Sequence, residues 1–315
     1  MSASRIAAVV VAWNRADMLV DTLDALAGQT RPLDDLVVVD NASTDTTPQV
    51  LAAHPGVTDI VTMTRNLGGA GGFAAGIARA IARGADLVWI MDDDTVPHPD
   101  ALEALLRVRE DYEGTPAVLA CRADWTDGRE HPMNRPRTRV GLAPRLHRKA
   151  EAVGARQIRT ASFVAILIDA RAVREEGLPQ ADYFLWNDDF EYTSRLLRTR
   201  IGLYVDGARV EHRTKVFGNS TADPGPRMVN EVRNKVWAFT RSPGLSPADK
   251  ILFGGMTALR WARLLATTSE RGAMAERIVD GVRQGLHAPR ATSEVLAGTP
   301  VAAEVAALDV GGTGD

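Results

Sequence analysis

LVWIMDDD, at residues 87–94, is the stretch that decides how this chain is expected to fold. A short apolar run predicts a buried strand, and three consecutive carboxylates, Asp92, Asp93 and Asp94, follow it. Because parallel strands present ligands at their carboxyl ends, and because adjacent carboxylates repel one another, the pattern favours a divalent cation, Mg2+ or Mn2+, with bound phosphates. An exposed acidic turn that caps the following helix explains the three aspartates equally well.

Apolar strands alternate with helical patterns along the whole first part of the chain. Strands are also predicted at residues 6–13, 36–39 and 60–63, and the intervening segments carry apolar residues at helical spacing. Strands that are apolar throughout and separated by helices predict an α/β fold with a parallel, doubly wound sheet. The ligand crevice of such a sheet lies at the strand ends, which are marked here by Asn14, Asp40, Asn66 and Asp92.

Composition and charge narrow the class of protein. The 315 residues are 45% hydrophobic, which is enough for a full core, and the net charge of -3 provides no basic field for nucleic acid. Cys121 is the single cysteine, so an internal disulfide and a thiolate metal cluster are excluded. We expect a cytoplasmic protein, soluble or peripheral to a membrane, because no signal-peptide pattern and no membrane-spanning apolar run is found.

The glycine-rich segment at residues 66–73 permits two interpretations. Residues 69–74, GAGGFA, match the dinucleotide fingerprint, and Asp92 ends the next strand at the expected distance. A dinucleotide-dependent oxidoreductase is therefore the alternative function. Against it, the fingerprint normally occupies the first strand-to-helix turn. In the other interpretation, small residues let a helix and its loop approach a nucleoside closely. Asp40 has a similar ambiguity, because its carboxylate suits a uracil imide or a ribose hydroxyl but also ordinary turn chemistry.

Motifs in a fixed order give the chain a resemblance to a known family. They lie at residues 9–15, 29–32, 38–43, 65–68, 92–94, 177–195 and 207–212. Together they resemble the inverting family 2 glycosyltransferases, which have the GT-A nucleotide-sugar-binding fold, a mostly parallel sheet flanked by helices. Glu191 replaces a more usual aspartate of that family.

Within this family, residues 66–73, the triple aspartate and residues 186–189 are most similar to bacterial galactofuranosyltransferases and their rhamnosyltransferase relatives. The actinobacterial enzymes that begin the galactan chain of arabinogalactan are the best match. The resemblance implies UDP-galactofuranose as donor and a rhamnosyl-GlcNAc-diphospho-decaprenol as acceptor. A rhamnosyltransferase or other hexosyltransferase of the cell envelope is the alternative, and a sugar-nucleotide sensor without turnover is a third.

The resemblance also assigns catalytic roles. Mn2+ or Mg2+ would be held by Asp92, Asp94 and His212, and the nitrogen ligand favours Mn2+. Asp189 would be the base that accepts the proton of the acceptor hydroxyl, with Asp188 beside it. Repulsion between these adjacent carboxylates favours a raised pKa for one of them. Without the flanking motif, the pair would be interpreted as a charge cluster at a helix start.

Substrate contacts are expected from further residues. The donor is expected to contact Asn14, Asp40, Asn66, Gly68, Gly69, Asp92 and Asp93. Trp186 is a candidate platform for a sugar ring, with a core tryptophan as the alternative. Arg233 and Asn234 resemble a motif of the same relatives and are assigned to a phosphate or to the acceptor.

The expected organisation is one catalytic domain with a C-terminal extension. Residues 1–245 form the glycosyltransferase domain, with a nucleotide-sugar half at 1–120 and an acceptor half at 121–245. Within the second half, the arginine-rich residues 122–159 are interpreted as an irregular excursion. Residues 246–291 are expected to form amphipathic helices, and 292–315 a disordered tail. Basic amphipathic helices suit the inner face of a membrane, although packing against the core or against another subunit in a homo-oligomer is equally consistent.

Overall fold

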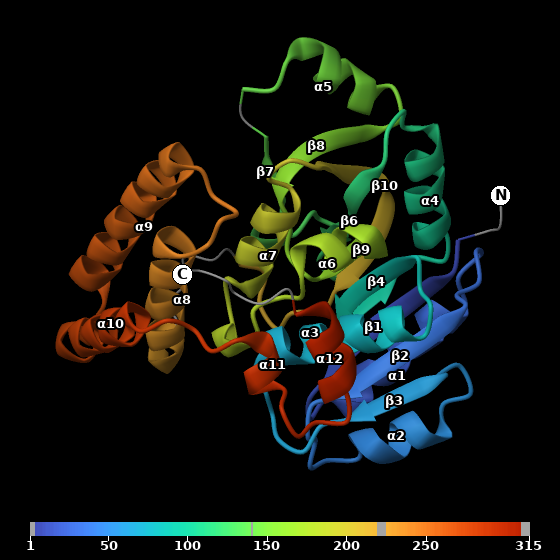
Figure 1. Cartoon of the computed structure of the whole chain (residues 1–315), viewed down its shortest axis with the longest axis horizontal. Helices are drawn as coiled ribbons and strands as arrows, with labels where there is room; N and C mark the ends of the chain where they lie inside the picture. The colour runs from blue at the N-terminus through green and yellow to red at the C-terminus, as the bar shows by residue number, and fades with distance from the viewer. Residues whose placement is uncertain (1–3, 140, 219–224, 310–315) are drawn as a thin grey trace.

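The computed structural model describes residues 4–139, 141–218 and 225–309, and in this part of the chain ten strands form one sheet with helices on both faces (Figure 1). The strands are β1 (Ile6–Ala12), β2 (Asp35–Asp40), β3 (Asp59–Thr62), β4 (Leu87–Asp92), β5 (Thr95–Pro97), β6 (Pro116–Asp124), β7 (Arg137–Thr138), β8 (Ala155–Thr160), β9 (Ala165–Asp169) and β10 (Ile201–His212). The α-helices are α1 (Ala16–Ala27), α2 (Thr47–Ala53), α3 (Gly68–Ala82), α4 (Ala101–Asp111), α5 (Pro144–Glu151), α6 (Ala170–Glu176), α7 (Asp188–Leu196), α8 (Met228–Thr240), α9 (Pro247–Thr267), α10 (Arg271–Leu286), α11 (Thr292–Val295) and α12 (Ala302–Leu308). Three short 3-10 helices lie at Pro132–Asn134, Ala181–Tyr183 and Gly225–Arg227.

The first four predicted strands form the parallel part of the sheet. Their order is β3-β2-β1-β4, with Val9 of β1 opposite Val37 of β2 and Ile90 of β4. The strands β1 and β2 are buried along their whole length, which explains why their sequences are apolar without alternation. The α/β fold with a mostly parallel central sheet is confirmed, and the carboxyl ends of β1, β2 and β4 meet at one edge.

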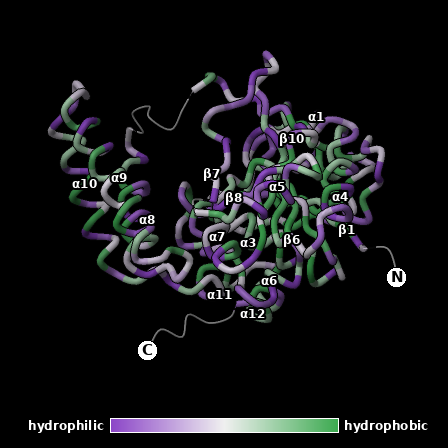
Figure 2. The backbone as a smooth tube through the Cα atoms, turned by 90° about the horizontal axis from the view of Figure 1, so that it is seen from above, coloured by the Kyte–Doolittle hydropathy of each residue, from purple (hydrophilic) through white to green (hydrophobic). Residues whose placement is uncertain are grey.

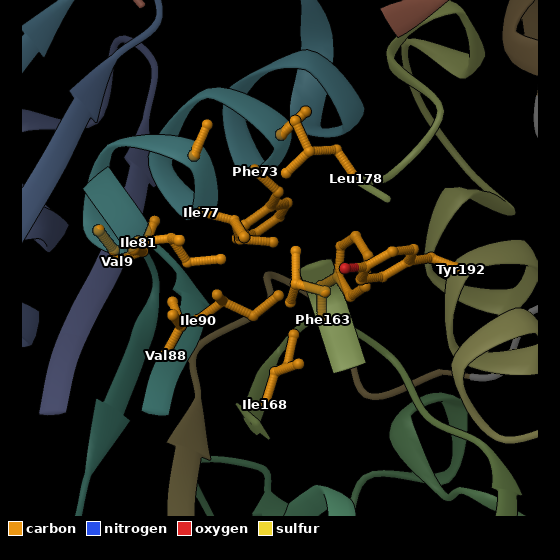
Figure 3. Packing of buried hydrophobic residues seen from close by; sticks show 14 of the residues in the cluster. Val9, Phe73, Ile77, Ile81, Val88, Ile90, Phe163, Ile168, Leu178 and Tyr192 are labelled. Atoms are coloured by element: carbon orange, nitrogen blue, oxygen red, sulfur yellow. The ribbon is translucent and has the colours of Figure 1, made fainter. Parts of the chain in front are cut away.

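The glycine-rich motif serves the packing of α3 against this sheet. A Cβ atom on Gly76 would lie 2.3 Å from Cγ1 of Val9, and one on Gly72 would lie 2.5 Å from Cγ1 of Val11. The next turns of the helix place Phe73 and Ile77 in the core, facing Ile90 (Figure 3). Gly72 of the motif and Gly76 in the turn after it are therefore needed for close helix–sheet packing.

The second half of the sheet is more antiparallel than the first. Strand β9 lies between β4 and β6 and is antiparallel to both, and β10 pairs parallel with β6 and antiparallel with β8. The segment at 122–159 is ordered over more of its length than expected, since it contains β7, α5 and most of β8. Gln157, Ile158 and Thr160 of β8 are buried. The strand was not predicted because arginines interrupt its apolar residues.

Helices α8, α9 and α10 form a group beside the sheet (Figures 1 and 2). The predicted helical extension is present, and Met274 of α10 is fully buried against Met228 and Val232 of α8. The outer side of α9 exposes large apolar residues: Ile251, Leu252, Met256 and Leu259. In the described ranges, no helix combines the length and the apolar character that a membrane span requires.

The expectation of disorder after residue 291 is wrong for the residues that the structure describes. Val295, Leu296, Val301 and Val305 of the α11–α12 segment are buried in the same core cluster as α3. A salt bridge of 2.9 Å between Arg79 and Glu304 joins α3 to α12. Small and acidic residues dominated the composition here and concealed four core positions. Residues 310–315 of the predicted tail lie outside the described residues.

Candidate active site

The carboxyl end of β4 and the end of β10 bring three potential metal ligands together. Ligand atoms of Asp92, Asp94 and His212 all lie within 4.8 Å of one another, and Nε2 of His212 is 3.3 Å from Oδ1 of Asp94. Asp94 and His212 are both buried, although 118 positions separate them in the sequence. Two carboxylates and one imidazole form a donor set that suits Mn2+. The residues that were predicted to share a metal are thus adjacent in space.

Burial and neighbouring charges give the three aspartates different proton affinities. Burial and the charge of Asp94 raise the pKa of Asp92 to about 6, and burial raises that of Asp93 to about 7. Burial alone would also raise the pKa of Asp94, but His212 and Arg15 outweigh it and lower that pKa. Arg15 pairs with both Asp94 and Asp93. Arg15, which was not among the predicted site residues, is therefore the cation that neutralises this cluster.

Two further residues fix the orientation of the cluster. Nδ1 of His212 lies 2.9 Å from Oδ1 of Asn134, a contact that leaves Nε2 directed towards Asp94. The backbone N–H of Trp13 donates to Oδ2 of Asp93 over 3.1 Å, and the side chain of Trp13 is 51% exposed. Neither role could be predicted from the sequence, because Asn134 lies in the excursion and Trp13 reads only as the end of a strand.

A strained loop carries the acidic pair into the same edge of the sheet. Phe184, Trp186 and Asn187 all have positive φ angles, of 62°, 70° and 65°. Such angles cost energy in residues other than glycine and persist only where neighbouring structure enforces them. Gly68 is part of that structure, because a Cβ atom there would lie 1.9 Å from the carbonyl oxygen of Phe184. Gly68 thus contacts the loop that precedes Asp188.

Asn234 and Arg233 of α8 hold this loop through hydrogen bonds to its backbone. The side-chain amide of Asn234 donates to the carbonyl oxygens of Tyr183, Leu185 and Trp186, over 2.9, 3.0 and 2.7 Å. Arg233 donates to the Tyr183 oxygen over 2.9 Å. Asn234 is fully buried and its amide is occupied by these carbonyl oxygens. It therefore positions the loop, instead of contacting an acceptor as predicted. Trp186 is half-buried, with the guanidinium of Arg227 5.9 Å from its ring centre.

The acidic pair begins helix α7, and its charges act on the predicted metal ligand Asp92. Burial and the charge of Asp189 raise the pKa of Asp188 well above its ordinary value, and burial also raises that of Asp189. The charge of Asp189 is near enough to raise the pKa of Asp92. Lys235 of α8 and Arg137 of β7 counteract the rise at Asp189. The predicted base and metal ligands therefore share one site, and the two cations were not predicted.

The remaining predicted donor residues line the ends of β1, β2 and the start of α3. Oδ1 of Asn14 accepts from the N–H of Thr44 over 2.7 Å, and Oδ1 of Asp40 accepts from Ser43 over 2.9 Å. Oδ1 of Asn66 accepts from Gly68 over 2.7 Å. Gly69 is partly exposed, and a Cβ atom there would meet nothing closer than 3.9 Å. These residues border the same edge of the sheet as the acidic clusters.

The chain is similar to proteins of one enzyme family. The family model described as Glycosyl transferase family 2 matches residues 7–176. The galactofuranosyltransferase GlfT1 of Mycobacterium tuberculosis is 32% identical over 281 residues, covering 84% of this chain and 90% of that protein. The alternative of a dinucleotide-dependent oxidoreductase is therefore wrong, in keeping with the packing role of Gly72 and Gly76.

Solved structures agree in fold. The S. aureus protein TarS, residues 1–349 in complex with UDP-GlcNAc, superposes with a TM-score of 0.62 at 15% identity, covering 97% of this chain and 88% of that one. GalNAc-T7 with UDP, GalNAc and Mn2+ gives a TM-score of 0.58 at 14% identity, covering 95% and 59%. The chain belongs to glycosyltransferase family 2 and is a glycosyltransferase with the GT-A fold.

Proposed function

We propose that this enzyme transfers galactofuranose from UDP-galactofuranose to a polyprenyl-diphosphate-linked rhamnosyl-GlcNAc acceptor in the synthesis of cell-wall galactan. The proposal is supported by the similarity to a galactofuranosyltransferase along 90% of its length. The observation that carries the chemistry is the meeting of Asp92, Asp94 and His212 with the Asp188–Asp189 pair. Such a site offers a metal for the leaving diphosphate and a base for the acceptor.

Asp92, Asp94 and His212 are proposed to hold Mn2+ or Mg2+, and their two carboxylates and one imidazole fit Mn2+ best. A bound metal would act as a Lewis acid that stabilises the charge of the departing UDP. Arg15 pairs with Asp94 and Asp93, and so adds positive charge on the same side. We propose that Asp93 orients the donor sugar and that Asn14, Asp40, Asn66, Gly68 and Gly69 border the nucleotide.

Asp189 is proposed to be the general base. It accepts the proton of an acceptor hydroxyl while that oxygen bonds to the anomeric carbon and the bond from this carbon to UDP breaks, which inverts the configuration. Burial raises the pKa of Asp189, which makes it a stronger proton acceptor. Asp188, with a pKa raised well above its ordinary value, is proposed to orient the acceptor. Trp186 is proposed to contact a sugar ring.

The proposed location is the inner face of the cytoplasmic membrane, where a polyprenyl-linked acceptor is available. The exposed apolar residues of α9 support a peripheral contact with lipid: Ile251, Leu252, Met256 and Leu259.

Transfer assays with several radiolabelled UDP-sugars and a synthetic diphosphate-linked rhamnosyl-GlcNAc acceptor test the substrate assignment. We expect transfer from UDP-galactofuranose and none without divalent metal. Preferential transfer of another sugar would contradict the galactofuranose assignment and support another hexosyltransferase. Binding of UDP-sugar with no transfer to any acceptor would point to a sensor.

A further inference from the structure

Two cationic side chains that the proposed mechanism does not use act on the charge of Asp189. The guanidinium carbon of Arg137 is 5.4 Å from the ring centre of Phe190, and Nζ of Lys235 is 4.1 Å from the same ring centre. Arg137 also lies 5.0 Å from the ring centre of Phe253 on α9. Two positive charges, from β7 and α8, thus lie against aromatic rings of α7 and α9. We call these two cations the Arg137–Lys235 pair.

The protein anion whose charge acts on both members of this pair is Asp189. Among the described residues, neither side chain forms a hydrogen bond or a salt bridge, whereas the nearby Arg195 and Arg260 pair with Glu191 and Glu231. Lys235 is only 7% exposed, and buried lysines are almost always paired. Burial and the charge of Arg137 lower the pKa of Lys235 to about 7. Two adjacent cations of this kind form a site for an anionic ligand.

The pair and Arg15 act on different carboxylates of the site. Arg137 and Lys235 act on the charge of Asp189, whereas Arg15 is the cation that pairs with Asp93 and Asp94 at the metal ligands. Phe190, Phe253 and Phe239 surround the pair with apolar surface, and α9 continues from there to its exposed apolar side. Negative charge followed by a hydrocarbon chain is the chemistry that fits this arrangement.

We propose that Arg137 and Lys235 bind the diphosphate of a polyprenyl-diphosphate acceptor, with Phe190 and Phe253 contacting the start of its hydrocarbon chain. This inference rests on the proposed function, because it assigns the acceptor side of the same site. In this site the buried Lys235 would contact the diphosphate from the protein interior, and the exposed Arg137 would contact it from the solvent side. From this site the two sugars of the acceptor would extend to Asp189, while the lipid points towards α9.

Binding of farnesyl diphosphate tests the pair without any transfer. Calorimetry is performed with the full-length protein, saturated with UDP and Mn2+ so that the donor diphosphate site is filled. We expect binding that weakens roughly 10- to 100-fold in Arg137→Gln and in Lys235→Met, as for losing a hydrogen bond to a charged group. Arg145→Gln, in an exposed arginine of the same excursion, is the control and should bind normally. Melting temperatures confirm that each variant is folded.

Acceptor kinetics provide a readout that a purely structural role would not change. For an acceptor with a diphosphate-linked lipid, both variants should raise KM, while KM for a neutral alkyl rhamnosyl-GlcNAc and for the UDP-sugar should stay unchanged. An equal rise in KM for both acceptors would overturn the inference. Farnesyl diphosphate binding that is unaltered in the two variants would overturn it as well. Displacement of farnesyl diphosphate by UDP would also overturn it and assign the cations to the donor diphosphate. Normal farnesyl diphosphate binding in a protein that transfers no UDP-sugar would instead contradict the proposed function alone.

Discussion

Asp92, Asp93 and Asp94 follow one another in the chain but meet different neighbours. Asp94 contacts His212 and Arg15, Asp93 accepts from the backbone of Trp13, and Asp92 remains partly exposed towards Asp189. Alternation along the chain end sends adjacent side chains in different directions. The sequence predicts that carboxylates gather here, but the contacts of each carboxylate depend on residues from three other segments.

Loss of one proposed metal ligand should separate donor binding from folding. Asp94→Ala removes a carboxylate at the metal cluster but no apolar core group, so we expect Mn2+-dependent UDP binding to disappear while the melting temperature changes little. Calorimetry with UDP and Mn2+ measures this. Asp127→Ala, in an exposed aspartate that pairs with Arg129, is a suitable control. Unchanged metal-dependent binding in Asp94→Ala would contradict the assignment.

The affinity for Mn2+ should depend on pH in a defined direction. Because the pKa of Asp92 is raised to about 6, its carboxylate is protonated below that pH, and metal binding must then displace a proton. Affinity should therefore be fully present above about pH 7 and fall by roughly tenfold per pH unit below about pH 6. Titrations between these values test it. In Asp92→Asn, binding should be weaker throughout and should lose the part of the pH dependence that Asp92 contributes.

Elements differ in how far the sequence predicts them. The strands β1, β2 and β4 are apolar along their length and were predicted within one or two residues. Strand β8 was missed because two arginines interrupt its buried residues and one of those buried residues is a glutamine. Helices α11 and α12 were missed because their core contacts depend on α3. Arg137 and Lys235 are 98 positions apart, and no local sequence pattern predicts that both lie near the ring of Phe190.

Close packing of α3 on the sheet makes a stability prediction. In Gly76→Ala the new Cβ would lie 2.3 Å from Cγ1 of Val9, so the helix or the strand must shift. We expect destabilisation of about 1–3 kcal/mol, the usual cost of overpacking a core. Chemical denaturation measures this. Gly255→Ala in α9, where a Cβ meets nothing within 4 Å, should leave stability equal or slightly higher. Equal stabilities of Gly76→Ala and the wild type would refute the packing role.

The whole molecule combines the sheet that carries the site with the group of helices α8, α9 and α10, of which α9 exposes apolar side chains. Ile251, Leu252 and Leu259 of α9 are 78%, 56% and 63% exposed, an unusual concentration of large apolar side chains. Their outward direction is not fixed by the amphipathic pattern alone, since Trp261 and Leu264 on the same helix pack inward. Only the tertiary arrangement separates the inner side from the outer side.

Membrane association should follow from these exposed residues. Deleting everything after residue 245 would also remove α11 and α12 from the core, so substitution is the cleaner test. The triple variant Ile251→Ser, Leu252→Ser and Leu259→Ser should bind phosphatidylglycerol vesicles more weakly than the wild type, with UDP affinity unaltered. Ile60→Ser, in an exposed residue of β3, is the control. Equal sedimentation of the triple variant with vesicles would place the membrane contact elsewhere.

Asp189 as the base beside the proposed metal ligands is the central assignment of the mechanism. Single-turnover transfer from UDP-galactofuranose, measured together with donor affinity, tests this in Asp189→Asn, which keeps the side-chain size but removes the proton acceptor. We predict unchanged donor affinity and transfer that falls roughly 100- to 10,000-fold. Asp188→Asn should cost less, since Asp188 is proposed only to orient the acceptor. Near-normal transfer by Asp189→Asn would contradict the mechanism, and a larger loss in Asp188→Asn would assign the base to Asp188.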